Sequence, residues 1–165
     1  EHRLPEVKEA CIGLTFVLAA SAGILLMSHD VHAGEHLKDL LVGQILWVSS
    51  TQLIATALLY AVLLAVLRWQ QLGHLGFYAL FALAVTASVQ LAGVYLVFAS
   101  LIVPALATYL IKARRMLYAF AIGIAGYAIG LLLSALLDLP GGAAIVWAMA
   151  IVGGLTALTL HARKL

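Results

Sequence analysis

A continuous apolar stretch from Leu75 to Ile111 limits what this chain can fold into more than any other feature. It holds no charged residue, and its apolar side chains do not alternate with polar ones as they do in the strands of a membrane barrel. A membrane helix needs about 20 apolar residues. The stretch is too long for one such helix and has the length of two. We predict that Gln90–Gly93 separates them.

The rest of the 165-residue chain has the same character, since 65% of its residues are hydrophobic and 10% are charged. Soluble domains usually have about 25% charged residues, so a water-soluble domain and a disordered chain are both excluded. The net charge is only +2 and the basic residues are scattered along the chain, which excludes a nucleic-acid-binding protein. A single cysteine, Cys11, excludes an internal disulfide and a thiolate metal cluster within one chain. The fold class predicted is all-α, a polytopic membrane helix bundle.

Polar interruptions divide the chain into six predicted transmembrane helices within a single transmembrane domain over residues 1–165. Two of them lie in Leu75–Ile111, and the others are Ala10–Ser28, Thr51–Leu67, Leu117–Leu137 and Ala143–Leu160. Leu37–Val48 is too short to span a bilayer, and we predict that it is a re-entrant or interfacial helix.

The basic residues predict the orientation of this bundle. With six spans both termini share a side, and of the nine lysines and arginines only Lys38 falls on the other side. Basic residues concentrate on the cytoplasmic side of membrane proteins. We therefore predict a multi-pass protein with both termini cytoplasmic.

Acidic residues are missing from the membrane part of the chain, since no aspartate or glutamate occurs between Leu40 and Leu137. This argues against a proton-driven pump, which needs ionisable groups within its spans. The sequence also has no phosphate-binding loop, nucleophile elbow or catalytic triad pattern. We therefore predict that the chain is not an enzyme.

The predicted outer loop is rich in histidine and carboxylate. Its candidate metal ligands are His29, Asp30, His32, Glu35 and His36. His32 and His36 are four residues apart and share a face if the segment is helical. Imidazole and carboxylate together suit zinc, manganese or iron. The alternative is a solvated loop whose polar residues only keep it out of the bilayer.

Two features within the spans have simpler interpretations. Pro104 removes one backbone hydrogen bond and opposes the carbonyl of Ser100, which predicts a kinked helix. Gly126 and Gly130 form a pair of small residues four apart, a pattern that lets membrane helices pack closely. Gly123, Gly153 and Gly154 receive the same interpretation.

Four stretches, taken in order, resemble the permease subunit of the ABC importers for zinc and manganese. They are Glu9–Gly13, Leu40–Ser49, Gly93–Ala105 and Ser134–Val146, of which Gly93–Ala105 is the most specific. The resemblance implies transport of Zn²⁺ or Mn²⁺ across a bacterial-type plasma (inner) membrane. It also implies a separate ATPase and a separate metal-binding protein as partners. No resident cofactor is implied, and zinc or manganese would be substrate or bound ion.

Two departures from that family set a limit on the resemblance. Its permeases are longer and have further N-terminal helices, so we expect this chain to be a C-terminal part of such a permease or a shortened one. The chain opens at Glu1 without a signal peptide pattern, which fits a processed or longer protein. The family also has an ATPase-docking cytoplasmic helix where this chain has only Arg68–Gly76, without an acidic residue.

These departures leave two functions open. The first is a membrane permease subunit for a divalent metal ion. The second is a permease-derived structural or assembly subunit of a larger membrane complex, with no ATP-coupled transport. A membrane enzyme has no motif in its support.

Overall fold

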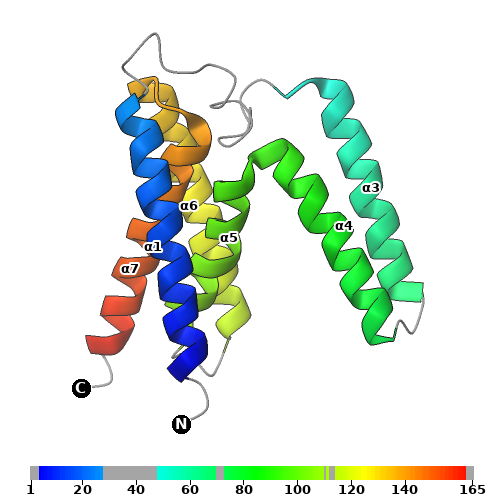
Figure 1. The fold of residues 1–165 in the computed structure, drawn as a ribbon, viewed down its shortest axis with the longest axis horizontal. Helices are drawn as coiled ribbons and strands as arrows, with labels where there is room; N and C mark the ends of the chain where they lie inside the picture. Colours follow the sequence, from blue (N-terminus) through cyan, green and yellow to red (C-terminus); the bar gives the residue numbers. More distant parts are fainter. Residues whose placement is uncertain (1–3, 28–47, 70–72, 110, 112–113, 163–165) are drawn as a thin grey trace.

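The computed structural model describes residues 4–27, 48–69, 73–109, 111 and 114–162, and its regular elements are all α-helices (Figure 1). They are α1 (Leu4–Met27), α3 (Ser50–Trp69), α4 (His74–Ala92), α5 (Val94–Ala107), α6 (Arg115–Leu137) and α7 (Gly141–Ala162). The all-α membrane bundle is confirmed, because five of these helices are long and apolar enough to cross a membrane. The short helix predicted over Leu37–Val48 lies outside the described residues, apart from Val48.

The predicted break in the long apolar stretch is confirmed at Gly93, between α4 and α5. Gly93 has a φ of 81°, a backbone conformation that residues with a Cβ rarely adopt. Its N–H donates to the Val89 carbonyl at 2.9 Å, and its carbonyl accepts from the Val97 N–H at 3.3 Å. One glycine therefore ends one helix and starts the next.

The six predicted helices are all present among the described residues, but α5 ends at Ala107 and not at Ile111. Its 14 residues give a length of about 21 Å, against a hydrocarbon core of about 30 Å. The Thr108 N–H and hydroxyl both donate to the Pro104 carbonyl, at 3.1 and 2.7 Å. The next amide, of Tyr109, bonds only three residues back to Leu106, so the helix tightens into a turn.

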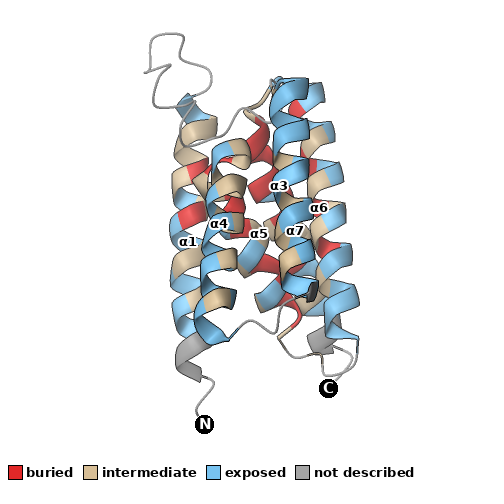
Figure 2. Ribbon diagram, turned by 90° about the vertical axis from the view of Figure 1, so that its right-hand side faces the viewer, coloured by how far each residue is buried: buried red, intermediate tan, exposed pale blue. Residues whose placement is uncertain are grey.

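The short helix α5 lies in the middle of a bundle with α1, α6 and α7 (Figures 1 and 2). Its inward face is fully covered, with Leu96, Ala99 and Val103 at most 3% exposed. These side chains form one core with Val17 of α1 and with Ile145, Val146 and Met149 of α7. These contacts with α1 and α7 hold the short helix α5 in the bundle.

Glycine lets α6 and α7 pack closely, as the pair of small residues predicted. A Cβ on Gly130 would lie 2.4 Å from the Ile145 Cα, and one on Gly126 would lie 2.8 Å from the Met149 Cα. Gly153 of α7 is also a point of close packing, because a Cβ there would lie 2.6 Å from a side-chain methyl group of Val103 on α5. The interpretation was wrong for Gly123 and Gly154, where a Cβ would meet nothing within 4 Å.

Helices α3 and α4 form a hairpin that leans away from the bundle (Figure 1). This hairpin has no buried core of its own. No residue in the 18-residue apolar window of α3 is buried, and α4 has no buried residue. Only residues 70–73 join the two helices. This agrees with the expected short turn at Arg68–Gly76 and leaves no room for a further helix there.

Both ends of the described chain lie at one end of the molecule, together with the connections α3–α4 and α5–α6 (Figure 1). We call this the basic end, because Lys8, Arg68, Arg114 and Arg115 belong to it. The opposite end, which we call the outer end, carries the end of α1, the start of α3 and the α6–α7 turn. That the basic end faces the cytoplasm stays a prediction.

Cysteine labelling tests this orientation. In a Cys11→Ser background we expect a membrane-impermeant maleimide added outside intact cells to label Ser49→Cys and to leave Arg115→Cys unlabelled. The physical reason is that chain segments rich in lysine and arginine are retained in the cytoplasm. After the cells are opened, Arg115→Cys should label fully. Labelling of Arg115→Cys in intact cells would contradict the orientation.

Candidate functional site

The predicted metal ligands His29, Asp30, His32, Glu35 and His36 all lie outside the described residues. The structure places the elements on either side of them, since α1 ends at Met27 and α3 begins at Ser50, both at the outer end (Figure 1). Within the described ranges, no three histidine, cysteine, aspartate or glutamate residues come together to hold a metal ion. We therefore still predict a strong metal site in the outer loop.

The described residues do bring polar side chains together inside the membrane part, beginning between α3 and α4. The Tyr60 and Ser88 hydroxyls lie within hydrogen-bonding distance of each other and of the Ala84 carbonyl oxygen, at 3.0 and 2.9 Å from that oxygen. One hydroxyl can donate to the other while the second donates to the carbonyl. These bonds join residues far apart in the sequence, so they fix how α3 lies against α4.

A second polar pair lies between α5 and α6. The Tyr127 side chain hydrogen-bonds Ser100, whose hydroxyl also donates to the Val97 carbonyl at 2.8 Å. Pro104 has no N–H, so the Ser100 carbonyl lacks the donor that a helix normally supplies four residues later. Two hydroxyls and one helix carbonyl without that donor therefore lie close together.

Both hydroxyl pairs line one cavity of about 360 Å³, which is formed by α3, α4, α5 and α6. We call it the hydroxyl cavity, after Tyr60, Ser88, Ser100 and Tyr127. A second pocket of about 300 Å³ lies between α3 and α4 nearer the outer end, and Gln52, Thr56 and Gln90 line it. The two hollows share Leu91 in their linings. Polar side chains therefore line two neighbouring hollows, one nearer the outer end and one between the hairpin and the bundle.

The polar atoms that line the two hollows are neutral hydroxyl and amide groups. Hydroxyl, amide and carbonyl oxygens can replace part of the hydration shell of a passing cation. None of the residues lining the two hollows carries a charge. Tight binding of a transition metal usually takes imidazole, thiolate or carboxylate. The lining of these two hollows therefore lacks the ligands that tight binding of a transition metal usually takes.

A third and larger hollow of about 860 Å³ continues toward the basic end between α5 and α6. It shares Ser100, Leu101 and Tyr127 with the hydroxyl cavity. Most of its remaining lining is apolar, and Arg115 lies at its basic end. We call it the α5–α6 groove. Its apolar surface and its cationic end make it a poor route for a metal ion.

The sequence did not predict that Tyr60, Ser88, Ser100 and Tyr127 line one cavity. A signal was present, because polar side chains within membrane helices usually face other helices or a cavity. Single tyrosines and serines at irregular spacing nevertheless do not indicate which of them meet. Of these four residues the sequence singled out only Ser100, as the residue whose carbonyl Pro104 opposes.

Comparisons with known proteins agree with the membrane fold. The profile of the ABC 3 transport family matches residues 2–77 and 70–159. A protein of Haemophilus influenzae described as a probable iron transport system membrane protein is 26% identical over 163 residues. That match covers 84% of this chain, and the chain spans 60% of the length of this relative. No solved structure matches the chain.

Proposed function

The chain belongs to the ABC 3 transport family, and from this we propose that it is a membrane subunit that conducts a divalent metal ion. The observation that carries the proposal is the family match over residues 2–77 and 70–159, which is nearly the whole chain. The family consists of transport components and is not an enzyme class. Zinc and manganese are the metals that the sequence resemblance favours, and the name of the relative adds iron.

The proposed unit is one transmembrane domain over residues 1–165. Because the chain spans 60% of the Haemophilus protein, it corresponds to part of a longer permease or to a shortened one. Its proposed setting is a bacterial inner membrane with both termini in the cytoplasm. The ATPase and the metal-binding protein of such a system are separate chains.

The proposed route has two stages. Histidines and carboxylates of the outer loop receive the ion at the outer face. The hydroxyl cavity then gives it neutral oxygen ligands on its way between the α3–α4 hairpin and the bundle. Division of the two tasks is chemically reasonable, because conduction requires binding that is weak enough for the ion to leave.

A second candidate, a structural or assembly subunit without ATP-coupled transport, is favoured by the connection between α3 and α4. Residues 70–73 leave no space for an ATPase-docking helix. The two family matches overlap within residues 70–77, so the alignment to the family breaks at this place. The alignment to the Haemophilus protein has 163 positions but covers only 84% of this chain, so some of its positions are gaps in this chain. The relative therefore has internal residues that this chain lacks.

Flux measurements on proteoliposomes distinguish the two candidates. With the purified chain and a cognate ATPase, we expect entry of ⁶⁵Zn or ⁵⁴Mn down a gradient without stimulation of ATP hydrolysis. The pair Tyr60→Phe with Ser88→Ala should lower this flux severalfold, because it removes the two hydroxyls that α3 and α4 contribute to the hydroxyl cavity. Thr86→Ala is the matched control, since that hydroxyl bonds only to its own helix at the Ala82 carbonyl.

The outcomes are separable. Absence of flux above empty liposomes would reject the transport proposal and leave the structural subunit. Robust ATP hydrolysis stimulated by the chain would show that another cytoplasmic segment contacts the ATPase. Equal flux in the double variant and in wild type would remove the hydroxyl cavity from the route.

A further inference from the structure

The α5–α6 groove has the shape and lining of a site for a hydrocarbon chain. Residues with small side chains or none form part of it, namely Pro104, Ala105, Ala119 and Gly123. A Cβ on Gly123 would meet nothing within 4 Å, so this part of the groove is open. The α6 residues of the groove run from Arg115 to Tyr127, about 18 Å along the helix. One leaflet of hydrocarbon is about 15 Å thick, half of the bilayer core.

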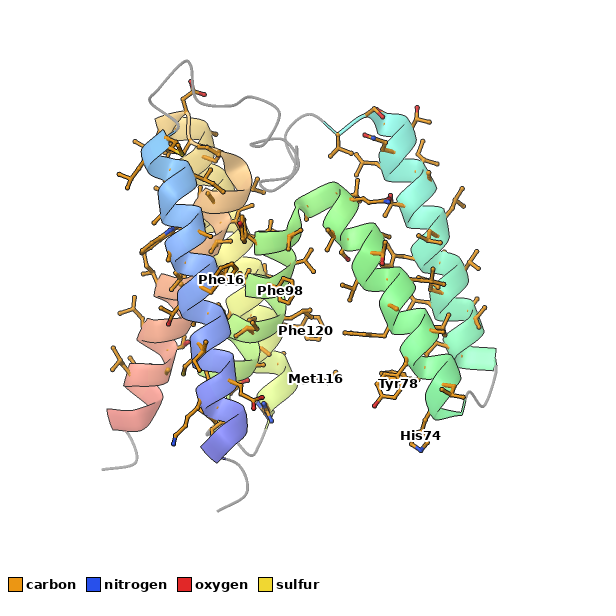
Figure 3. All side chains as sticks on the ribbon, in the orientation of Figure 1. Phe16, His74, Tyr78, Phe98, Met116 and Phe120 are labelled. Atoms are coloured by element: carbon orange, nitrogen blue, oxygen red, sulfur yellow. The ribbon has the colours of Figure 1, made fainter. Side chains whose placement is uncertain are left out.

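The groove opens to the side of the molecule. Leu101, Met116, Phe120 and Ile124 line it and are 47, 75, 64 and 70% exposed. Figure 3 shows Met116 and Phe120 projecting from α6 on the side of the bundle that faces the α3–α4 hairpin. In a membrane protein such side chains contact lipid unless a neighbouring helix covers them.

The hydroxyls of the groove need no partner from a ligand. Thr108 donates to the Pro104 carbonyl at 2.7 Å, and Ser100 donates to the Val97 carbonyl at 2.8 Å. No buried side-chain nitrogen or oxygen in the described part of the chain lacks a hydrogen bond. An apolar ligand can therefore fill the groove without leaving a polar group unsatisfied.

The basic end of the groove carries the charge. Arg115 donates from one guanidinium nitrogen to the Ala105 carbonyl at 3.3 Å. A guanidinium has five N–H donors, so others stay available. Arg114 stands beside it in the sequence, and no acidic residue occurs in the first turn of α6. A cation at the membrane surface above an apolar groove matches an anionic head group above an acyl chain.

We propose that the α5–α6 groove binds an anionic phospholipid of the leaflet at the basic end, with its phosphate at Arg115 and one acyl chain along Ala105, Ala119 and Gly123. This site adjoins the proposed metal route at Ser100, Leu101 and Tyr127, and the residues proposed to hold the lipid lie on the basic side of these three. The bound lipid covers apolar surface of α5 and α6 that no other described helix covers.

Native mass spectrometry of the full chain tests the head-group half of the proposal. Titration with phosphatidylglycerol should give a tightly retained lipid, and phosphatidylcholine of the same chain length should be retained less. Arg115→Gln should weaken phosphatidylglycerol retention about fivefold and leave phosphatidylcholine unchanged. Arg114→Gln is the matched control, because it removes the same charge one residue away and does not line the groove. Equal losses in both variants would overturn the proposal in favour of general attraction to a basic surface.

A second pair of variants tests the acyl-chain half. Gly123→Leu places a side chain in the groove and should lower retention of both lipids. Gly154→Leu on α7 also points into open space and should not change retention. Circular dichroism of both variants confirms that the helices form. Unchanged retention in Gly123→Leu would overturn the proposal, and so would a dimer that excludes lipid from the wild-type chain.

Discussion

Replacing Gly130 by alanine should destabilise the bundle by about 2–3 kcal/mol and lower its thermal midpoint by at least about 5 °C. The added methyl group would lie 2.4 Å from the Cα of Ile145 and 2.9 Å from its nitrogen. Backbone atoms cannot move aside as the end of a side chain can. Helices α6 and α7 must therefore separate, and the core that Ile145 forms with Val17 and Leu96 must open with them.

This cost is large because membrane helices are held together mainly by close packing, without a hydrophobic force between them. A series along α6 gives the control. Gly126→Ala should be intermediate, since its methyl group would lie 2.8 Å from Met149. Gly123→Ala should be neutral or slightly stabilising, because the site is open and alanine favours a helix by about 1 kcal/mol. Thermal unfolding followed by circular dichroism in one detergent compares all three, and similar midpoints would contradict the close approach.

Removing two histidines of the outer loop should abolish strong metal binding. If the chain holds zinc there, the pair His32→Ala with His36→Ala should weaken Zn²⁺ affinity more than about 100-fold, since loss of a second-shell partner alone costs 10–100-fold. Isothermal titration of Zn²⁺ into the purified chain measures this. His74→Ala with His161→Ala is the matched control. His74 begins α4 and His161 is next to the last residue of α7, and both of these helix ends lie at the basic end, away from the outer loop (Figure 1).

The same binding should depend on pH in one direction. Protonated imidazole cannot ligate a metal, and the pKa of an ordinary histidine is about 6.5. Zinc affinity should therefore be full above this pH and decrease as the pH falls through it. Equal affinity in the wild type and in the outer-loop variant would remove the loop as a metal site and leave a hydrated segment in its place.

Much of the fold could be predicted from the sequence. The lengths of the apolar stretches predicted most helix ends to within two residues, although α1 begins at Leu4 and not at Ala10. The break at Gly93 followed from a stretch too long for one span. The end of α5 could not be predicted in this way. The apolar run continues to Ile111, but the helix ends at Ala107, and the amides of Tyr109 and Ile111 bond three residues back, to Leu106 and Thr108.

Candidate sites were predictable to a smaller extent. The histidines of the outer loop stand out in the sequence, and they stay a prediction. The hydroxyl cavity depends on Tyr60 meeting Ser88 and on Ser100 meeting Tyr127, pairs that lie on different helices. The spacing of these residues along the chain does not indicate which of their side chains are in contact.

Hydropathy and helix-breaking residues are local properties, and the sequence alone therefore determined that this protein is a membrane bundle and where most of its helices begin and end. Which helix faces meet depends on atoms far apart in the chain. Gly123 and Gly130 illustrate this, because both are glycines of the same helix with similar neighbours in sequence. Only the packing of α7 against α6 makes one of them a point of backbone contact and leaves the other open in the α5–α6 groove.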